Sequence, residues 1–149
     1  DRKRTRKFYW EQVAEIESLL VRYIKGSSGI DVDKYLRVCE QLGEEPDPKK
    51  MPPDRSDFPE EVQVAFFVSG YLEDKWEGMS GTYMGKVWTN IEYLFKLFEV
   101  QDPVIVLYFM KMFETAIVNE KAEKAEKERK AEERRSSSGG KNFTHNVTG

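Results

Sequence analysis

The segment from Asp102 to Arg135 constrains the fold of this 149-residue chain more than any other feature. Asp102-Pro103 is a typical helix start, because the carboxylate can cap the first turn and proline suits its first position. Residues 104–118 are apolar almost all round, which predicts a central, deeply buried helix. From Glu120 the sequence becomes EKAEKAEKERKAEERR, in which no apolar side chain is larger than alanine.

This charged half predicts that the helix continues out of the core. Three favourable pairs are spaced four residues apart: Glu120–Lys124, Glu123–Lys127 and Glu126–Lys130. Each pair contributes about 0.2–0.5 kcal/mol to helix stability. We expect a solvated rod, with a total helix length of roughly 50 Å. Because the rod lacks apolar a and d positions, a spacer fits it better than a coiled coil does.

Four shorter helices are expected before this one. Their predicted ranges are residues 8–25, about 32–42, Ser56 to about Tyr71, and about 88–99. The first two show apolar residues at three- and four-residue spacing, with Asp31 as N-cap and Gly43 as C-cap of the second. The alternation in VQVAFFV (62–68) resembles a strand, but the helix-start residues before it favour a helix.

The predicted fold class is therefore all-α, a single-domain bundle of about five helices whose last helix is long and projecting. We expect a basic N-terminal arm over residues 1–7, the helical domain over 8–119, the charged extension over 120–135 and a flexible tail over 136–149. The proline-rich stretch 43–57 is predicted to be a surface loop rather than a domain boundary.

Charge is divided unevenly along the chain. Residues 1–7 carry a net charge of +4, whereas residues 8–119 hold 11 basic and 20 acidic side chains, a net charge of −9. An acidic domain repels nucleic-acid backbones, so we expect no nucleic-acid partner for it. The alternative is a nucleic-acid-associated regulator that uses the basic arm.

Reaction chemistry is not indicated by the residue types. The chain has one cysteine, Cys39, and one histidine, His145, which excludes an intrachain disulfide and a zinc site of Cys/His type. Cys39 lies on the apolar stripe of its helix and is expected to be buried. The acidic pairs Asp54 with Asp57 and Glu60 with Glu61 suit a helix start. We expect no enzyme and no cofactor.

No run approaches the roughly 18 apolar residues of a membrane helix, and no secretory segment is evident near the start. We therefore expect a cytoplasmic protein without membrane contact. The sequence does not fix the oligomeric state.

The stretch EGMSGTYMGK (77–86) resembles a phosphate-binding loop only superficially. The Walker pattern needs four residues between its two glycines and a hydroxyl residue after lysine, and neither condition holds here. Two interpretations remain: a packed loop between two helices, or a contact surface for a partner protein. The candidate contact residues are Trp76, Met79, Tyr83 and Lys86, since aromatic and Met side chains are enriched at interfaces.

The segment SSSGGKNFTHNVTG (136–149) begins as a flexible linker and ends with apolar residues. It is either disordered or a docking peptide, and in the second case Phe143 and His145 are the candidate contacts. Its two Asn-x-Thr sequons are attributed to chance, since no signal peptide was found.

Three segments together resemble small proteins of large contractile-tailed bacteriophages. They are MPPDRSDFPEEVQ (51–63), the W-x-G-M-S-G-x-Y-M-G-K stretch (76–86), and the end of the chain, KAEERR…GGKNFTHNVTG (130–149). The resemblance implies a virion protein or a tail or baseplate assembly factor in the host cytoplasm, with no catalytic residues. Our leading hypothesis is accordingly a non-enzymatic protein-binding module that acts in phage assembly.

Overall fold

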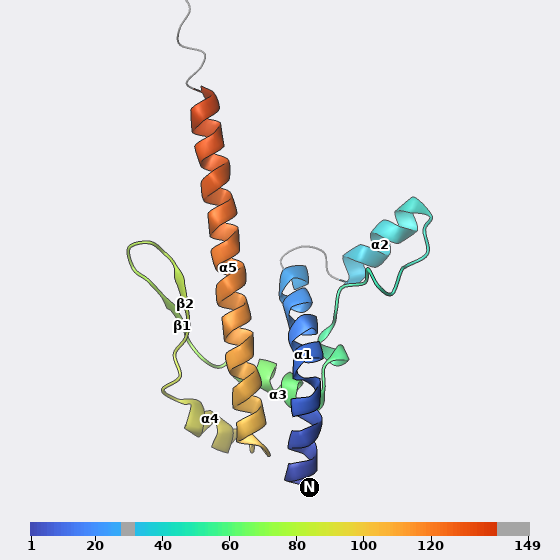
Figure 1. The fold of residues 1–149 in the computed structure, drawn as a ribbon, viewed down its shortest axis with the longest axis vertical. Coiled ribbons are helices and arrows are strands. Elements are labelled where there is room, and N and C mark those ends of the chain that lie inside the picture. The colour runs from blue at the N-terminus through green and yellow to red at the C-terminus, as the bar shows by residue number, and fades with distance from the viewer. Residues whose placement is uncertain (28–31, 140–149) are drawn as a thin grey trace, which may run out of the picture.

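The computed structural model describes residues 1–27 and 32–139 (Figure 1). The helices within these residues are α1 (Arg2–Ser27), α2 (Val32–Leu42), α3 (Glu60–Ser69), α4 (Ile91–Leu97) and α5 (Pro103–Gly139). A 3₁₀ turn, Arg55–Asp57, precedes α3. An antiparallel hairpin of β1 (Asp74–Trp76) and β2 (Tyr83–Lys86) lies between α3 and α4. The predicted all-α class with a long last helix is confirmed, whereas the hairpin was not predicted.

The core lies where α1, α3 and α5 meet. Helices α1 and α5 stand side by side and run in the same direction, with α3 behind them (Figure 1). Leu20 of α1, Val62 of α3 and Phe109 of α5 are almost completely buried there. Burying a side chain of this size stabilises a fold by roughly 1.5–3 kcal/mol. The apolar stripe predicted for residues 8–25 is confirmed at Ile16, Leu20 and Ile24.

Helix α5 is central, as predicted, because α1, α3 and β2 all pack against it, but it is buried on one side only. Its buried residues are Ile105, Val106, Phe109 and Met110. Val104, on the opposite side, is 50% exposed, and Leu107 and Tyr108 are also partly open. The buried residues of α5 share one core with buried residues of α1 and α3, while β2 contacts α5 at Glu114.

The charged half of α5 leaves the core and projects beyond the other helices, as predicted (Figure 1). Among the predicted pairs, Lys130 and Glu126 are in contact at 3.6 Å, and Arg129 also contacts Glu126 and Glu133. The helix extends to Gly139, four residues into the segment expected to be a flexible tail. Three serine hydroxyls, of residues 136–138, donate hydrogen bonds to carbonyls three residues earlier. Residues 140–149 lie outside the described residues.

The basic start of the chain is part of α1 and not a separate arm. The Lys3 amide donates a hydrogen bond to the Asp1 carboxylate, which therefore caps the first turn. Arg6 donates two hydrogen bonds, of 3.1 and 3.2 Å, to the buried carboxylate of Asp102 before α5. Burial raises the pKa of Asp102, but the bond and charge of Arg6 together with backbone amides at the start of α5 outweigh it, and the net pKa is lowered. This contact joins the first turns of α1 to the residue that precedes α5.

The predicted bounds are confirmed for α2, whereas α3 begins at Glu60, four residues after the predicted start at Ser56, because Arg55–Asp57 form a separate 3₁₀ turn and Phe58 is extended. Helix α2 covers Val32–Leu42 and Gly43 follows with a φ of +67°, as a C-cap glycine does. Cys39 is buried, as expected. The 3₁₀ turn is capped by Asp54, and the Asp57 carboxylate accepts the Asp54 amide in return. The candidate N-cap Asp31 lies outside the described residues.

Candidate functional site

The stretch 77–86, expected to be a loop, forms the turn and second strand of the β-hairpin. Trp76 pairs with Tyr83 and Lys75 with Gly85, which leaves Met84 as an extra residue that bulges from β2. The Glu77 carboxylate accepts hydrogen bonds from the amides of the turn. Strands of three and four residues are too short for the alternation by which a strand is recognised, which explains why the sequence did not predict them.

One carboxylate of α5 holds the hairpin. Glu114 Oε2 accepts a hydrogen bond of 2.7 Å from the Lys86 amide and one of 2.8 Å from the indole Nε1 of Trp88. Lys111 contacts Glu114 at 3.6 Å and places Nζ 4.0 Å from the Trp88 ring centroid. Gly85 has a φ of +98°, and a Cβ there would lie 2.8 Å from Glu114 Oε2. The hairpin backbone therefore meets the helix directly.

Two of the four candidate hairpin residues point inward. Tyr83 is only 6% exposed, and its hydroxyl donates a hydrogen bond of 2.8 Å to Asp74 Oδ1. The Lys86 Nζ lies 2.9 Å from the same oxygen. Burial raises the pKa of Asp74, but these two partners outweigh it and the net pKa is lowered. Burial and then the bond to Asp74 raise the pKa of Tyr83. Both residues stabilise the hairpin.

The other two candidates are exposed to solvent. Met79 at the tip of the hairpin is 97% exposed, and Trp76 on β1 is 54% exposed. A cleft of about 270 Å³ separates Trp76 and the turn from α5, and we call it the hairpin cleft. It is lined by Trp76, Ser80, Gly81, Thr82, Tyr83, Val118, Lys121, Ala122, Lys124, Ala125 and Glu128. The hairpin can be seen beside the middle of α5 in Figure 1.

A second apolar surface involves the ends of α3 and α4. The rings of Phe67, Tyr71 and Phe98 contact one another with centroid distances of 4.8–5.3 Å, and we call these three residues the aromatic patch. Phe67 and Tyr71 are each about half exposed. Aromatic rings open to solvent in a group are typical of a contact surface. The sequence analysis did not single out these residues.

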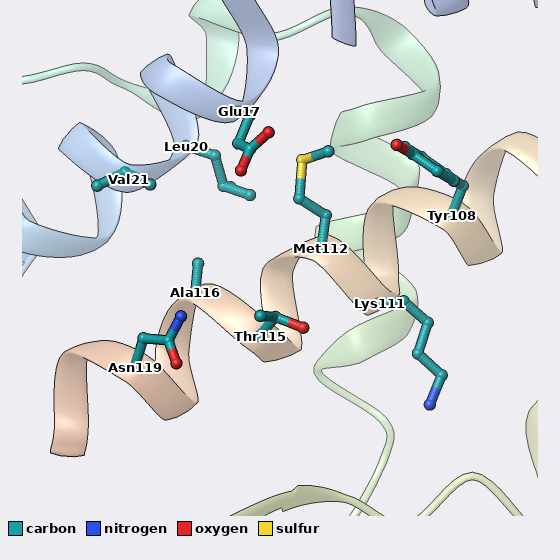
Figure 2. Close-up of a pocket in the computed structure, with 9 residues that line it drawn as sticks. All are labelled: Glu17, Leu20, Val21, Tyr108, Lys111, Met112, Thr115, Ala116 and Asn119. Carbon is teal, nitrogen blue, oxygen red and sulfur yellow. The ribbon is translucent and has the colours of Figure 1, made fainter. Parts of the chain in front are cut away.

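A third concave surface lies between α1 and α5, with a volume of about 360 Å³ (Figure 2). Leu20 and Val21 from α1 face Met112 and Ala116 from α5, and Glu17 lies at the rim. Figure 2 shows the Lys111 side chain directed away from the others, which agrees with its contact with Trp88. Its lining also includes the polar side chains of Thr115 and Asn119.

Some residues that build the hairpin site were missed by the sequence analysis, namely Asp74, Glu114 and Lys121. The sequence did contain a signal for Glu114. Lys111 and Glu114 are the charged residues within the apolar run 104–118. Glu114 contacts the end of β2, and Lys111 contacts Trp88 just after it. A charge inside an apolar helical run therefore indicated a polar partner packed against that side of α5.

Phe143 and His145 lie outside the described residues. Within residues 1–27 and 32–139, no three His, Cys, Asp or Glu side chains are grouped so that they could hold a metal ion. Across the same two ranges, no helix combines the length and apolar character needed to cross a membrane.

Comparison of the chain with protein-family models, with curated proteins and with solved structures found no match.

Proposed function

We propose that this chain is a non-enzymatic protein-binding module that contacts its partner through the hairpin. The supporting observation is that Trp76 and Met79 are open to solvent on a hairpin that is held in place. The Tyr83 hydroxyl donates a hydrogen bond to Asp74, and the Lys86 backbone amide donates one to Glu114 of α5. Trp and Met are enriched in the centres of protein interfaces. A contact residue that is already held in place loses less entropy on binding.

The chemistry of the chain suggests what the partner is like. Residues 8–119 carry a net charge of −9, so a partner with basic side chains around an apolar contact would be attracted and oriented. The aromatic patch offers a second area of contact for a partner of sufficient size. The resemblance to small proteins of contractile-tailed bacteriophages makes a virion or tail protein the partner that we expect, and assembly the role.

A nucleic-acid-associated regulator is the alternative function, and it would use the basic start of α1. Two of the cations there already have partners, since Arg6 is paired with Asp102 and Lys7 lies 3.8 Å from Glu11. We therefore favour protein binding. A titration of DNA against salt separates the two, because phosphate contacts give an affinity that falls steeply with salt.

The direct test is affinity capture from the native host with two matched variants. Trp76→Ala with Met79→Ala removes both exposed hairpin contacts and leaves Tyr83 in place. Tyr93→Ala removes an exposed ring from α4 and serves as control. We expect the hairpin variant to lose a defined partner that the wild type and the control both retain. Equal recovery by all three proteins, with folding confirmed by circular dichroism, would contradict the proposal.

A further inference from the structure

The ammonium group of Lys121 on α5 lies over two aromatic rings of the hairpin. Its Nζ is 5.4 Å from the ring centroid of Trp76 and 5.4 Å from that of Tyr83. The two centroids are 4.9 Å apart, and the ring planes are tilted by 58°. A cation within about 6 Å of an aromatic face is attracted by the ring quadrupole. The two rings therefore form a cation site that a side chain of the chain itself occupies.

The position of the two rings does not depend on Lys121. Trp76 and Tyr83 are cross-strand partners in the hairpin, and the Tyr83 hydroxyl is held by Asp74. The hairpin is in turn held to α5 by Glu114 through the Lys86 amide. Removing the Lys121 side chain should consequently leave the site in place and empty, ready to bind another cation.

The space beside the rings suits a long cationic side chain. The hairpin cleft opens next to Trp76, and its α5 wall includes Val118, Ala122 and Ala125, which are apolar and mostly small. The methylene stem of lysine or arginine packs well on such a surface while its charged end stays near water. Trp76 is half open to solvent, so the site can be reached from outside.

Electrostatics also favour a cation at this place. The Asp74 carboxylate accepts a hydrogen bond from the Tyr83 hydroxyl at the edge of the site and is paired with Lys86, and the Lys121 charge also acts favourably on it. The surrounding domain, residues 8–119, carries a net charge of −9. A cationic group approaching the hairpin is therefore attracted over a longer distance than the rings alone would allow.

We propose that the Trp76–Tyr83 pair binds a lysine or arginine side chain of the partner protein, which displaces Lys121. This inference rests on the proposed function and adds the chemistry of the group that the hairpin recognises. Lys121 acts as an internal competitor, so the partner must present its cation together with other contacts. The hairpin would thereby discriminate against isolated cations in solution.

The test uses the full chain and a short probe, an acetylated and amidated Gly-Lys-Gly peptide, titrated by NMR at the Trp76 indole resonance. Three variants are compared with the wild type: Lys121→Ala, Lys124→Ala and Trp76→Leu. Lys124 lines the same cleft, and its removal changes the net charge by the same amount, which makes Lys124→Ala the matched control. A peptide with norleucine in place of lysine lacks the ammonium group and controls for apolar binding.

We expect Lys121→Ala to bind the lysine peptide about fivefold more tightly than the wild type, because the internal cation no longer competes for the rings. Lys124→Ala should stay within about twofold of the wild type, since it leaves the rings occupied. Trp76→Leu, observed through the neighbouring resonances of the hairpin, should lose binding. Equal affinity of the Lys121 and Lys124 variants, or equal binding of the norleucine peptide, would overturn the proposal.

These outcomes are separable from those of the capture experiment. If the hairpin variant loses its protein partner but the titrations show no difference between Lys121→Ala and Lys124→Ala, the proposed function stands and the cation site is refuted. If the titrations succeed and capture is unchanged, the rings bind cations but the hairpin is not the surface that recruits the partner.

Discussion

Removing the carboxylate of Glu114 should release the hairpin from α5. This side chain accepts two hydrogen bonds, from the Lys86 amide at 2.7 Å and from the Trp88 indole at 2.8 Å. It is mostly buried, with a side-chain exposure of 17%. Glu114→Ala deletes both acceptor contacts, while Glu114→Gln keeps an oxygen in place but removes the charge.

The magnitude follows from these two bonds. A hydrogen bond to a charged group contributes about 1.5–3 kcal/mol to stability, and water can replace part of it once the hairpin lifts. We therefore expect Glu114→Ala to cost about 2–4 kcal/mol. Neutral hydrogen bonds are about half as strong as charged ones, so Glu114→Gln should cost about half as much. For a chain of this size the alanine variant should lower Tm by roughly 5–15 °C.

Urea unfolding measures the loss of stability, and amide hydrogen exchange measures the local opening of the hairpin. The Lys86 amide should exchange about 30- to 1000-fold faster in Glu114→Ala, since local opening becomes easier by the same free energy. Glu92→Ala is the control, because Glu92 forms an exposed pair with Lys96 and its loss should cost less than about 0.5 kcal/mol. A Glu114→Ala protein as stable as this control, with unchanged exchange at Lys86, would refute the reasoning.

Three further predictions concern the second strand of the hairpin, the buried phenols and the core. Gly85→Ala should destabilise the protein by about 1–3 kcal/mol, because φ is positive at Gly85 and the new Cβ would meet Glu114. An unchanged midpoint of urea unfolding would contradict this. Burial and hydrogen bonds to carboxylates raise the pKa values of Tyr9 and Tyr83 in the folded protein. The stability that these two phenols contribute is therefore complete below about pH 10 and is lost as the pH rises further. Absorbance at 295 nm near pH 11 should therefore fall short of that of the urea-unfolded chain by about two tyrosines, and coincident curves would show the idea to be wrong. Phe109→Ala should cost about 3–5 kcal/mol in calorimetry, since the ring is fully buried, and a loss under 1 kcal/mol would place the core elsewhere.

The helices were predictable because their signals are local. Asp102-Pro103 begins α5, Gly43 follows α2, and the apolar spacing of α1 marks its buried face. The start of α1 was placed six residues late, because its first turns carry five basic residues and no apolar one. The side chain that stabilises those turns, Asp102, lies 96 positions away from Arg6 and is not visible from the local pattern.

The hairpin site was predictable only in part. The sequence indicated Trp76 and Met79 as exposed contacts, and the structure places both at the surface. It did not show that the other two candidates, Tyr83 and Lys86, are mostly buried and bonded to Asp74. The direction of each side chain is set by strand pairing, and strand pairing depends on the register between residues that the local pattern does not specify.

The sequence by itself determined the helical class, the order of the helices and the projection of the charged half of α5, because periodicity, capping and i,i+4 charge pairs act within a few residues. Only the tertiary structure decided that one side of α5 stays open, that the glycine-rich stretch is a hairpin, and that Lys121 lies over two of its rings. Those features come from contacts between segments far apart in the chain, whose energies depend on geometry that forms only when the whole domain is folded.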